Sequence, residues 1–113
     1  MPKKIKKSPK KKKEKVQSRG IAIISFLKKA PAEKEFILID GRRLKDIKEL
    51  AFALGDMADN VFWHHVNDAR NDFVNWVNDV FEDKELAESM KNARDRISAQ
   101  ITVLKHMVNK LLK

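Results

Sequence analysis

The sequence predicts a small, mainly α-helical domain of the α+β class, with a short β-hairpin near its start, a long C-terminal helix and a disordered basic tail in front. Apolar residues recur every three or four positions through most of residues 46–112, which is the spacing of amphipathic helices. The pair Asp40-Gly41 separates two short apolar segments, as in a tight hairpin turn. The first 18 residues carry many lysines and almost no apolar side chains, which favours disorder.

These observations divide the chain into two parts. We expect a disordered lysine-rich tail over 1–18 and a single small helical domain over 19–113, with the hairpin around 35–45. A chain of 113 residues supports one domain, and its hydrophobic content of 42% is compatible with a folded core. The absence of cysteine excludes disulfides, thiolate metal sites and thiol nucleophiles, and it suits a reducing compartment.

The net charge of +9 is unevenly distributed along the chain. Residues 1–19 contain nine lysines and Arg19 against a single acid, Glu14, so this segment alone carries 10 − 1 = +9. Residues 20–113 contain 15 basic and 15 acidic side chains and sum to zero. Within them, residues 49–90 hold ten acids against two basic side chains, a net charge of −8. The composition is therefore that of a cationic tail on a neutral domain with an acidic middle.

The segment before the hairpin contains one apolar run, residues 20–27. Its pattern fits either a strand or a short buried helix over 21–27. The run is far shorter than the ~20 residues that span a bilayer. Lys28, Lys29 and Pro31 argue against a secretory signal, so we expect a soluble, cytoplasmic protein with a loop over 28–34.

The hairpin is expected to consist of strands over 35–40 and 41–44. The first helix should begin after Asp46 as its N-cap and end at Leu54, because Gly55 is a common helix stop. A short second helix should open at Asp56, with Asp59 in its first turn.

Apolar stripes define the remaining helices. One face of the second helix contains Val61, Phe62, His65 and Val66. Capping residues over 67–71 indicate a bend, after which the stripe of the third helix contains Phe73, Trp76, Val77, Val80 and Phe81. Asp83 is expected to cap a segment around 86–90.

The last helix is expected from about residue 93 to residue 112. Its apolar stripe contains Ile97, Ile101, Leu104, Val108 and Leu111. This stripe could complete the core of the monomer or pair with a second copy of the helix.

The tail is the strongest functional signal. Its candidate nucleic-acid-binding residues are Lys3, Lys4, Lys6, Lys7, Ser8, Pro9, Lys10, Lys11, Lys12, Lys13, Lys15 and Arg19. Lysines release counterions when they neutralise phosphates, so about six such contacts lose roughly 10³-fold in affinity between 50 and 200 mM salt. No aromatic residue lies among them to stack on bases, so we expect sequence-independent contacts with the phosphate backbone. The alternative is a solubilising arm, or one folded back onto the acidic body.

Two histidines are the best metal candidates. His64 and Asp68 are four residues apart and could share a helix face, with Asn71 and Asp72 nearby. His65, however, lies on the apolar stripe, and adjacent side chains on a helix diverge by about 100°. The simpler interpretation is that His65 is a hydrogen-bonded core residue that fixes the bend over 67–72.

No constellation of catalytic residues is evident. The serines lack a base and an orienting group, and the three glycines are isolated, so no phosphate-binding loop is present. We therefore expect a protein that is not an enzyme and that has no cofactor. Trp63 falls off the apolar stripe beside His64, and these two side chains are the candidates for a partner surface, unless Trp63 packs under the terminal helix.

Two resemblances add to this interpretation. The segment Ser8-Pro9-Lys10-Lys11 resembles the SPKK units of linker-histone tails, which implies a preference for the minor groove of A·T-rich DNA. Residues 35–87 resemble a family of small, largely archaeal domains of unknown function, which implies a stable shared domain but no activity. The matching positions are Asp40, Gly41, Arg42, Glu49, Leu50, Phe62, His64, His65, Val66, Asn67, Asn71, Asp72, Phe73, Asn75, Trp76, Asp83, Glu85, Leu86 and Ala87.

The leading hypothesis is a non-enzymatic nucleic-acid-associated protein whose tail binds DNA, in a chromatin or nucleoid setting, or ribosomal RNA. The alternative is a protein–protein adaptor that binds a basic partner through the acidic 49–90 surface, with Trp63 and His64. A third class is a small metal-dependent enzyme that uses His64, His65 and Asp72.

Overall fold

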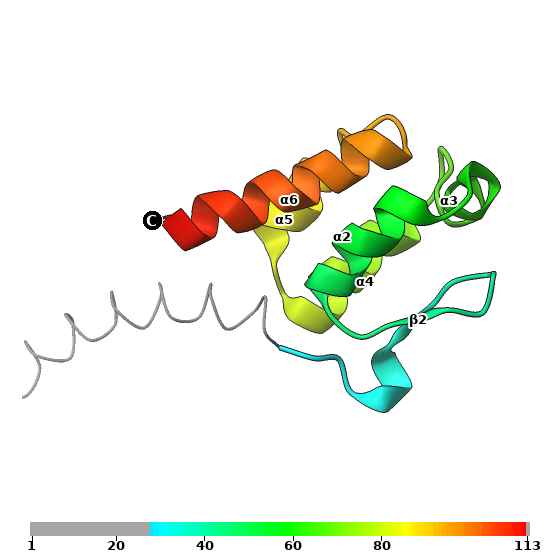
Figure 1. Cartoon of the computed structure of the whole chain (residues 1–113), viewed down its shortest axis with the longest axis horizontal. Coiled ribbons are helices and arrows are strands. Elements are labelled where there is room, and N and C mark those ends of the chain that lie inside the picture. The colour runs from blue at the N-terminus through cyan, green and yellow to red at the C-terminus, as the bar shows by residue number, and fades with distance from the viewer. Residues whose placement is uncertain (1–27, 113) are drawn as a thin grey trace, which may run out of the picture.

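The computed structural model describes residues 28–112 (Figure 1). The elements in chain order are η2 (Ala32–Lys34), β1 (Phe36–Ile37), β2 (Arg43–Leu44), α2 (Ile47–Asp56), α3 (Asp59–His65), α4 (Asp72–Phe81), α5 (Lys84–Met90) and α6 (Arg96–Leu112). The predicted class is confirmed: the fold is mainly helical, with a short hairpin near its start and a long C-terminal helix. The predicted tail over 1–18 and the predicted strand or helix over 21–27 lie outside the described residues.

The hairpin forms where the sequence predicts it. Its antiparallel register pairs Phe36 with Leu44 and Ile37 with Arg43. Gly41 has a backbone φ of 98°, which residues other than glycine rarely adopt. Its N–H donates to the Leu38 carbonyl at 2.8 Å and closes the turn. The Asp40 carboxylate accepts from the Arg42 N–H at 3.0 Å. The strands are shorter than predicted because the turn uses the residues between them.

Helix α2 begins as predicted but extends further. The Asp46 carboxylate accepts from the Glu49 N–H at 2.8 Å and caps the helix. The prediction that Gly55 stops this helix and that Asp56 opens the next one is wrong, because α2 includes both residues. A Cβ on Gly55 would meet the end of the Gln100 side chain, so this glycine leaves room for Gln100 of α6. Helix α3 begins at Asp59, the residue predicted to lie in its first turn.

Helices α4 and α5 form a tight helical pair. The Asn71 side chain caps α4 by accepting from the Val74 N–H at 3.1 Å. Glu82 ends α4 in the left-handed region, with a φ of 57°. The Asp83 carboxylate then accepts from the Leu86 N–H at 3.1 Å and caps α5, as the sequence predicts.

Helix α6 packs against α2 and α5 along one edge of the molecule (Figure 1). It begins at Arg96 rather than near residue 93, because Asp95 caps it by accepting from the Ser98 N–H at 2.7 Å. The Gln100 amide donates to the Ala51 carbonyl at 3.0 Å, and the Arg96 guanidinium donates to the Leu54 carbonyl at 2.8 Å. These bonds fix which side of α6 faces the domain.

The predicted apolar stripe of α6 does not complete the core. The side chains that α6 buries are Ala99, Val103 and His106, on its other side. The polar bonds to α2 explain this orientation, because they hold Arg96 and Gln100 toward the domain and turn the stripe outward.

Aromatic side chains join the hairpin to the helices. The ring of Phe36 stacks on that of Phe73 at 4.8 Å between centroids, and Phe73 stacks on Phe62 at 5.9 Å. The Trp76 indole N–H donates to the Lys34 carbonyl at 2.7 Å, which satisfies the one polar group of a nearly buried side chain. Within residues 28–112, no helix is long and apolar enough to cross a membrane.

Candidate functional site

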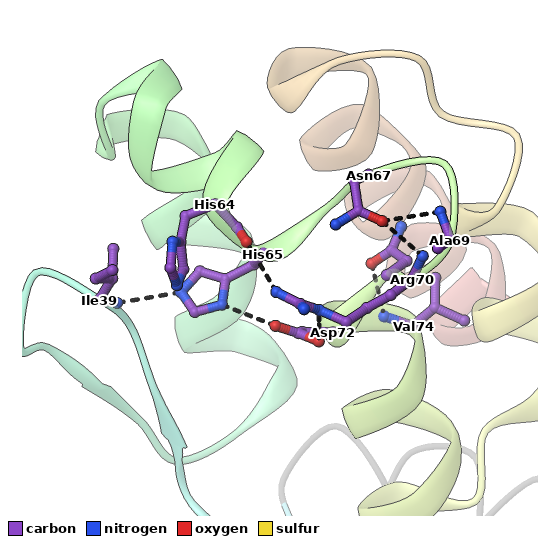
Figure 2. A network of polar contacts seen from close by, with 9 residues as sticks. Ile39, His64, His65, Asn67, Ala69, Arg70, Asp72 and Val74 are labelled. Atoms are coloured by element: carbon purple, nitrogen blue, oxygen red, sulfur yellow. Dashed lines mark hydrogen bonds and ion pairs between the residues drawn. The ribbon is translucent and has the colours of Figure 1, made fainter.

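His65 is held by hydrogen bonds on both ring nitrogens (Figure 2). Its Nε2 accepts from the Ile39 N–H at 3.1 Å, and its Nδ1 lies 3.0 Å from Asp72 Oδ2. A backbone N–H can only donate, so Nε2 carries no proton, and Nδ1 is the nitrogen that donates to Asp72. His65 is therefore a neutral imidazole without a free nitrogen for a metal or a substrate.

Asp72 and Arg70 extend this cluster into the bend between α3 and α4 (Figure 2). The second carboxylate oxygen of Asp72 lies 2.9 Å from Arg70 Nε, and Arg70 Nη2 donates to the His64 carbonyl at 3.0 Å. The Asn67 side chain accepts from the N–H groups of Ala69 and Arg70 at 2.8 and 2.9 Å. The prediction that His65 is a hydrogen-bonded core residue that fixes this bend is confirmed.

The candidate metal ligands do not form a site. Within residues 28–112, no group of three or more His, Cys, Asp or Glu side chains is arranged to hold a metal ion. The ring of His65 is occupied, and its partner Asp72 is already shared with Arg70. His64 is exposed, and its ring meets that of His65 edge-on at 4.9 Å between centroids.

Trp63 lies at the surface, where it lines a groove. Its side chain is 49% exposed, and its ring meets Phe62 edge-on at 4.9 Å. The alternative prediction, that Trp63 packs under the terminal helix, is therefore wrong. A groove of about 620 Å³ runs between residues 66–71, at the bend between α3 and α4, and residues 91–94. The Trp63 indole forms part of its wall. His64 does not line this groove.

The groove beside Trp63 has a cationic lining. Arg70, Lys91 and Arg94 line it against one acid, Asp68. Arg70 is engaged with Asp72, and Lys91 pairs with Glu88 at 2.6 Å, so Arg94 is the cation with the fewest competing contacts. Sequence reasoning missed Lys91 and Arg94 as groove residues, because no local pattern links them to a tryptophan almost 30 positions earlier.

The net negative charge that the sequence gives to residues 49–90 is partly compensated in the folded domain. Six of its ten acids form ion pairs, and the pairs are Asp56–Arg42, Asp59–Arg96, Asp72–Arg70, Asp83–His106, Glu85–Lys110 and Glu88–Lys91. Five of these six partners come from outside the region, and four of them are arginines or lysines, so folding neutralises much of the charge that the sequence concentrates there.

Two of these ion pairs join the start of α5 to the C-terminal half of α6. Burial would by itself raise the pKa of Asp83, but hydrogen bonds from His106 and from the Leu86 N–H outweigh burial and hold this pKa below its ordinary value. The hydrogen bond from Lys110 lowers the pKa of Glu85. Both carboxylates are therefore stabilised in their charged form in the folded chain.

No protein-family model, curated protein or solved structure matches this chain. The resemblance of residues 35–87 to a small, largely archaeal domain family stays a prediction from the sequence pattern. The tail candidates from Lys3 to Arg19 lie outside the described residues, so the described part of the site consists of Trp63, the groove beside it and the exposed His64.

Proposed function

We propose that the protein is a non-enzymatic nucleic-acid-associated protein whose lysine-rich tail binds phosphate backbones without sequence specificity. One observation carries this proposal: the whole net charge of +9 lies in residues 1–19. Such a charge density attracts polyanions through counterion release. The target is DNA in a nucleoid setting or ribosomal RNA, and the resemblance of Ser8-Pro9-Lys10-Lys11 to SPKK units favours DNA.

The groove beside Trp63 supports the same function on the folded domain. A half-exposed indole offers a face on which an unpaired base can stack, and the cations around it can reach the adjoining phosphates. Backbone contacts by the tail and base stacking in the groove are compatible, since the first requires no particular sequence and the second only an unstacked base.

The occupied nitrogens of His65 argue against the enzyme alternative. General acid–base catalysis and metal binding both need a ring nitrogen that faces a substrate or an ion. In this fold, the best candidate instead joins the hairpin to the 67–72 bend.

The test is binding of the full chain to an A·T-rich duplex, a single-stranded RNA and a folded ribosomal RNA fragment, measured by fluorescence anisotropy over a range of salt concentrations. A variant with the nine tail lysines changed to glutamine keeps the length of the tail and removes its charge. We expect this variant to lose most of the affinity and most of the salt dependence, since each phosphate contact contributes about 0.7–0.9 to the slope of log K against log salt. Affinity and slope equal to those of the unaltered chain would overturn the proposal.

The second candidate function is a protein–protein adaptor, and the exposure of Trp63 is the observation that favours it. A basic partner would bind the acids of the 49–90 surface, such as Asp68 in the groove beside Trp63, together with Trp63 and His64. Crosslinking in the native host followed by identification of the bound molecule separates the two functions: nucleic acid supports the first, and a single basic protein supports the second.

A further inference from the structure

Helix α6 presents a continuous apolar face to solvent. Its five exposed members are Ile97 (43% exposed), Ile101 (47%), Leu104 (42%), Val108 (51%) and Leu111 (55%). We refer to these five residues as the α6 seam. Helix α6 lies along one edge of the molecule (Figure 1), and the shallow depression along the seam is lined by Ile101, Leu104 and Val108.

The spacing within the seam is that of a coiled coil. Successive members are separated by four, three, four and three residues, which is the a/d pattern of a heptad repeat. A helix that buries its apolar face against several elements of its own domain usually shows a wider stripe. The narrow stripe and its alternation favour one other helix as the partner of the seam.

The seam cannot turn inward without loss of specific contacts. The opposite side of α6 is fixed by the bonds of Arg96 to Leu54 and Asp59, of Gln100 to Ala51, and of His106 to Asp83. These bonds occur along the helix from its first turn to its C-terminal half. The outward orientation of the seam is therefore a fixed property of the folded domain.

We propose that the α6 seam binds the α6 seam of a second copy of this chain, in an antiparallel helix pair related by a two-fold axis. Two copies of the same seam match in length, in spacing and in apolar character, as an isologous interface requires. The positions that flank the seam are Ser98, Gln100, Lys105, Met107 and Leu112, so one charge per helix borders it and few like charges oppose each other.

The charges of α6 favour the antiparallel orientation. From Arg96 to Leu112 the helix has no acid, and Arg96 and Lys110 are paired with Asp59 and Glu85 of the same domain, so Lys105 is the cation that borders the seam. A parallel pair would bring the two Lys105 side chains to the same level, whereas an antiparallel pair separates them and aligns the helix dipoles favourably. In the antiparallel pair Ile101 faces Leu104 of the second copy, and Ile97 faces its Val108.

The size of the seam sets the expected strength of this dimer. Five half-exposed aliphatic side chains offer on the order of a few hundred Å² of apolar surface, which is less than permanent dimers bury. We therefore expect a reversible dimer whose population rises with protein concentration. This inference goes beyond the proposed function, and its test uses no nucleic acid.

The test is sedimentation equilibrium of the full chain from about 1 to about 200 μM, at a salt concentration high enough to screen the tail. We expect the mass to rise from one chain to two. The double variant Ile101→Glu/Leu104→Glu should stay monomeric over the whole range. Phe52→Glu is the matched control, because Phe52 is 65% exposed on α2 and lies off the seam. This variant should dimerise like the unaltered chain, and circular dichroism should show the same helix content for all three proteins.

Two outcomes overturn the proposal. In the first, the unaltered chain is monomeric at every concentration. If the melting temperature of Ile101→Glu/Leu104→Glu is then well below that of Phe52→Glu, the seam is covered within the monomer, by the apolar residues 21–27 of the same chain. In the other, dimers form but the seam variant forms them equally well.

The absence of cysteine from the chain provides a test of orientation. Ile101→Cys and Leu104→Cys chains of different mass are mixed and oxidised mildly. An antiparallel pair yields mainly the mixed disulfide, whereas mainly self-linked chains would indicate the parallel arrangement and refute the orientation proposed here.

Discussion

His65→Phe tests whether the histidine joins the hairpin to the helical bend. The phenyl ring can keep the ring contacts with Phe36 and Phe73, which lie 5.0 and 5.5 Å from the imidazole, but it cannot bond to Ile39 or Asp72. Each lost hydrogen bond contributes about 1 kcal/mol, so the free energy of unfolding should fall by about 2 kcal/mol. His65→Ala also loses the ring contacts, and we expect a fall of about 3–4 kcal/mol.

The measurement is urea unfolding followed by far-UV circular dichroism, with an unchanged m-value as the check that both states keep their compactness. A loss of 2 kcal/mol corresponds to a melting temperature lower by roughly 8–16 °C in a domain of this size. The matched control is His64→Ala, because the neighbouring histidine is exposed, and its change should stay within about 0.5 kcal/mol. Equal effects at the two histidines, or a His65→Phe chain as stable as the unaltered one, would refute the reasoning.

Three further predictions follow from contacts at the helix ends and in the groove. The pKa values of Asp83 and Glu85 are lowered by folding, so their stabilisation is complete above the ordinary carboxyl pKa of about 4 and is lost as the pH falls through the lowered values. Asp83→Asn should therefore flatten the dependence of the urea midpoint on pH in this acidic range, and an unchanged dependence would contradict the role of its carboxylate. Glu82→Gly should raise the free energy of unfolding by about 1 kcal/mol because position 82 is left-handed, whereas Glu82→Ala should not, as two parallel urea titrations would establish. Arg94→Glu should leave the urea midpoint unchanged and weaken the binding of single-stranded RNA several-fold by anisotropy, and equal binding would remove the groove from the proposed interface.

Much of the fold could be predicted from the sequence because its signals are local. Apolar spacing identified the helices, and the capping residues Asp46 and Asp83 fixed two of their starts. Asp40-Gly41 identified the hairpin, because the positive φ at Gly41 follows from residue type. Each of these features depends on only a few residues that are adjacent in the sequence.

The errors arose where a distant residue decides the local structure. Gly55 was predicted to stop a helix, but α2 continues through it to Asp56, and the Gln100 side chain of α6 packs beside this glycine. The α6 seam could not be oriented from the sequence, because its direction depends on bonds between α6 and carbonyl groups of α2. The groove beside Trp63 was likewise hidden, since it arises only where the 66–71 bend meets residues 91–94.

The bond from the Ile39 amide to His65 gives the hairpin an unusual reporter of folding. The Ile39 side chain is 55% exposed at the tip of a hairpin with only two residue pairs, where amide hydrogens ordinarily exchange quickly through fraying. Its amide hydrogen is instead bonded to a ring nitrogen of a buried residue in α3. Deuterium uptake at this single surface position therefore reports the separation of the hairpin turn from α3, because exchange requires the bond to His65 to break.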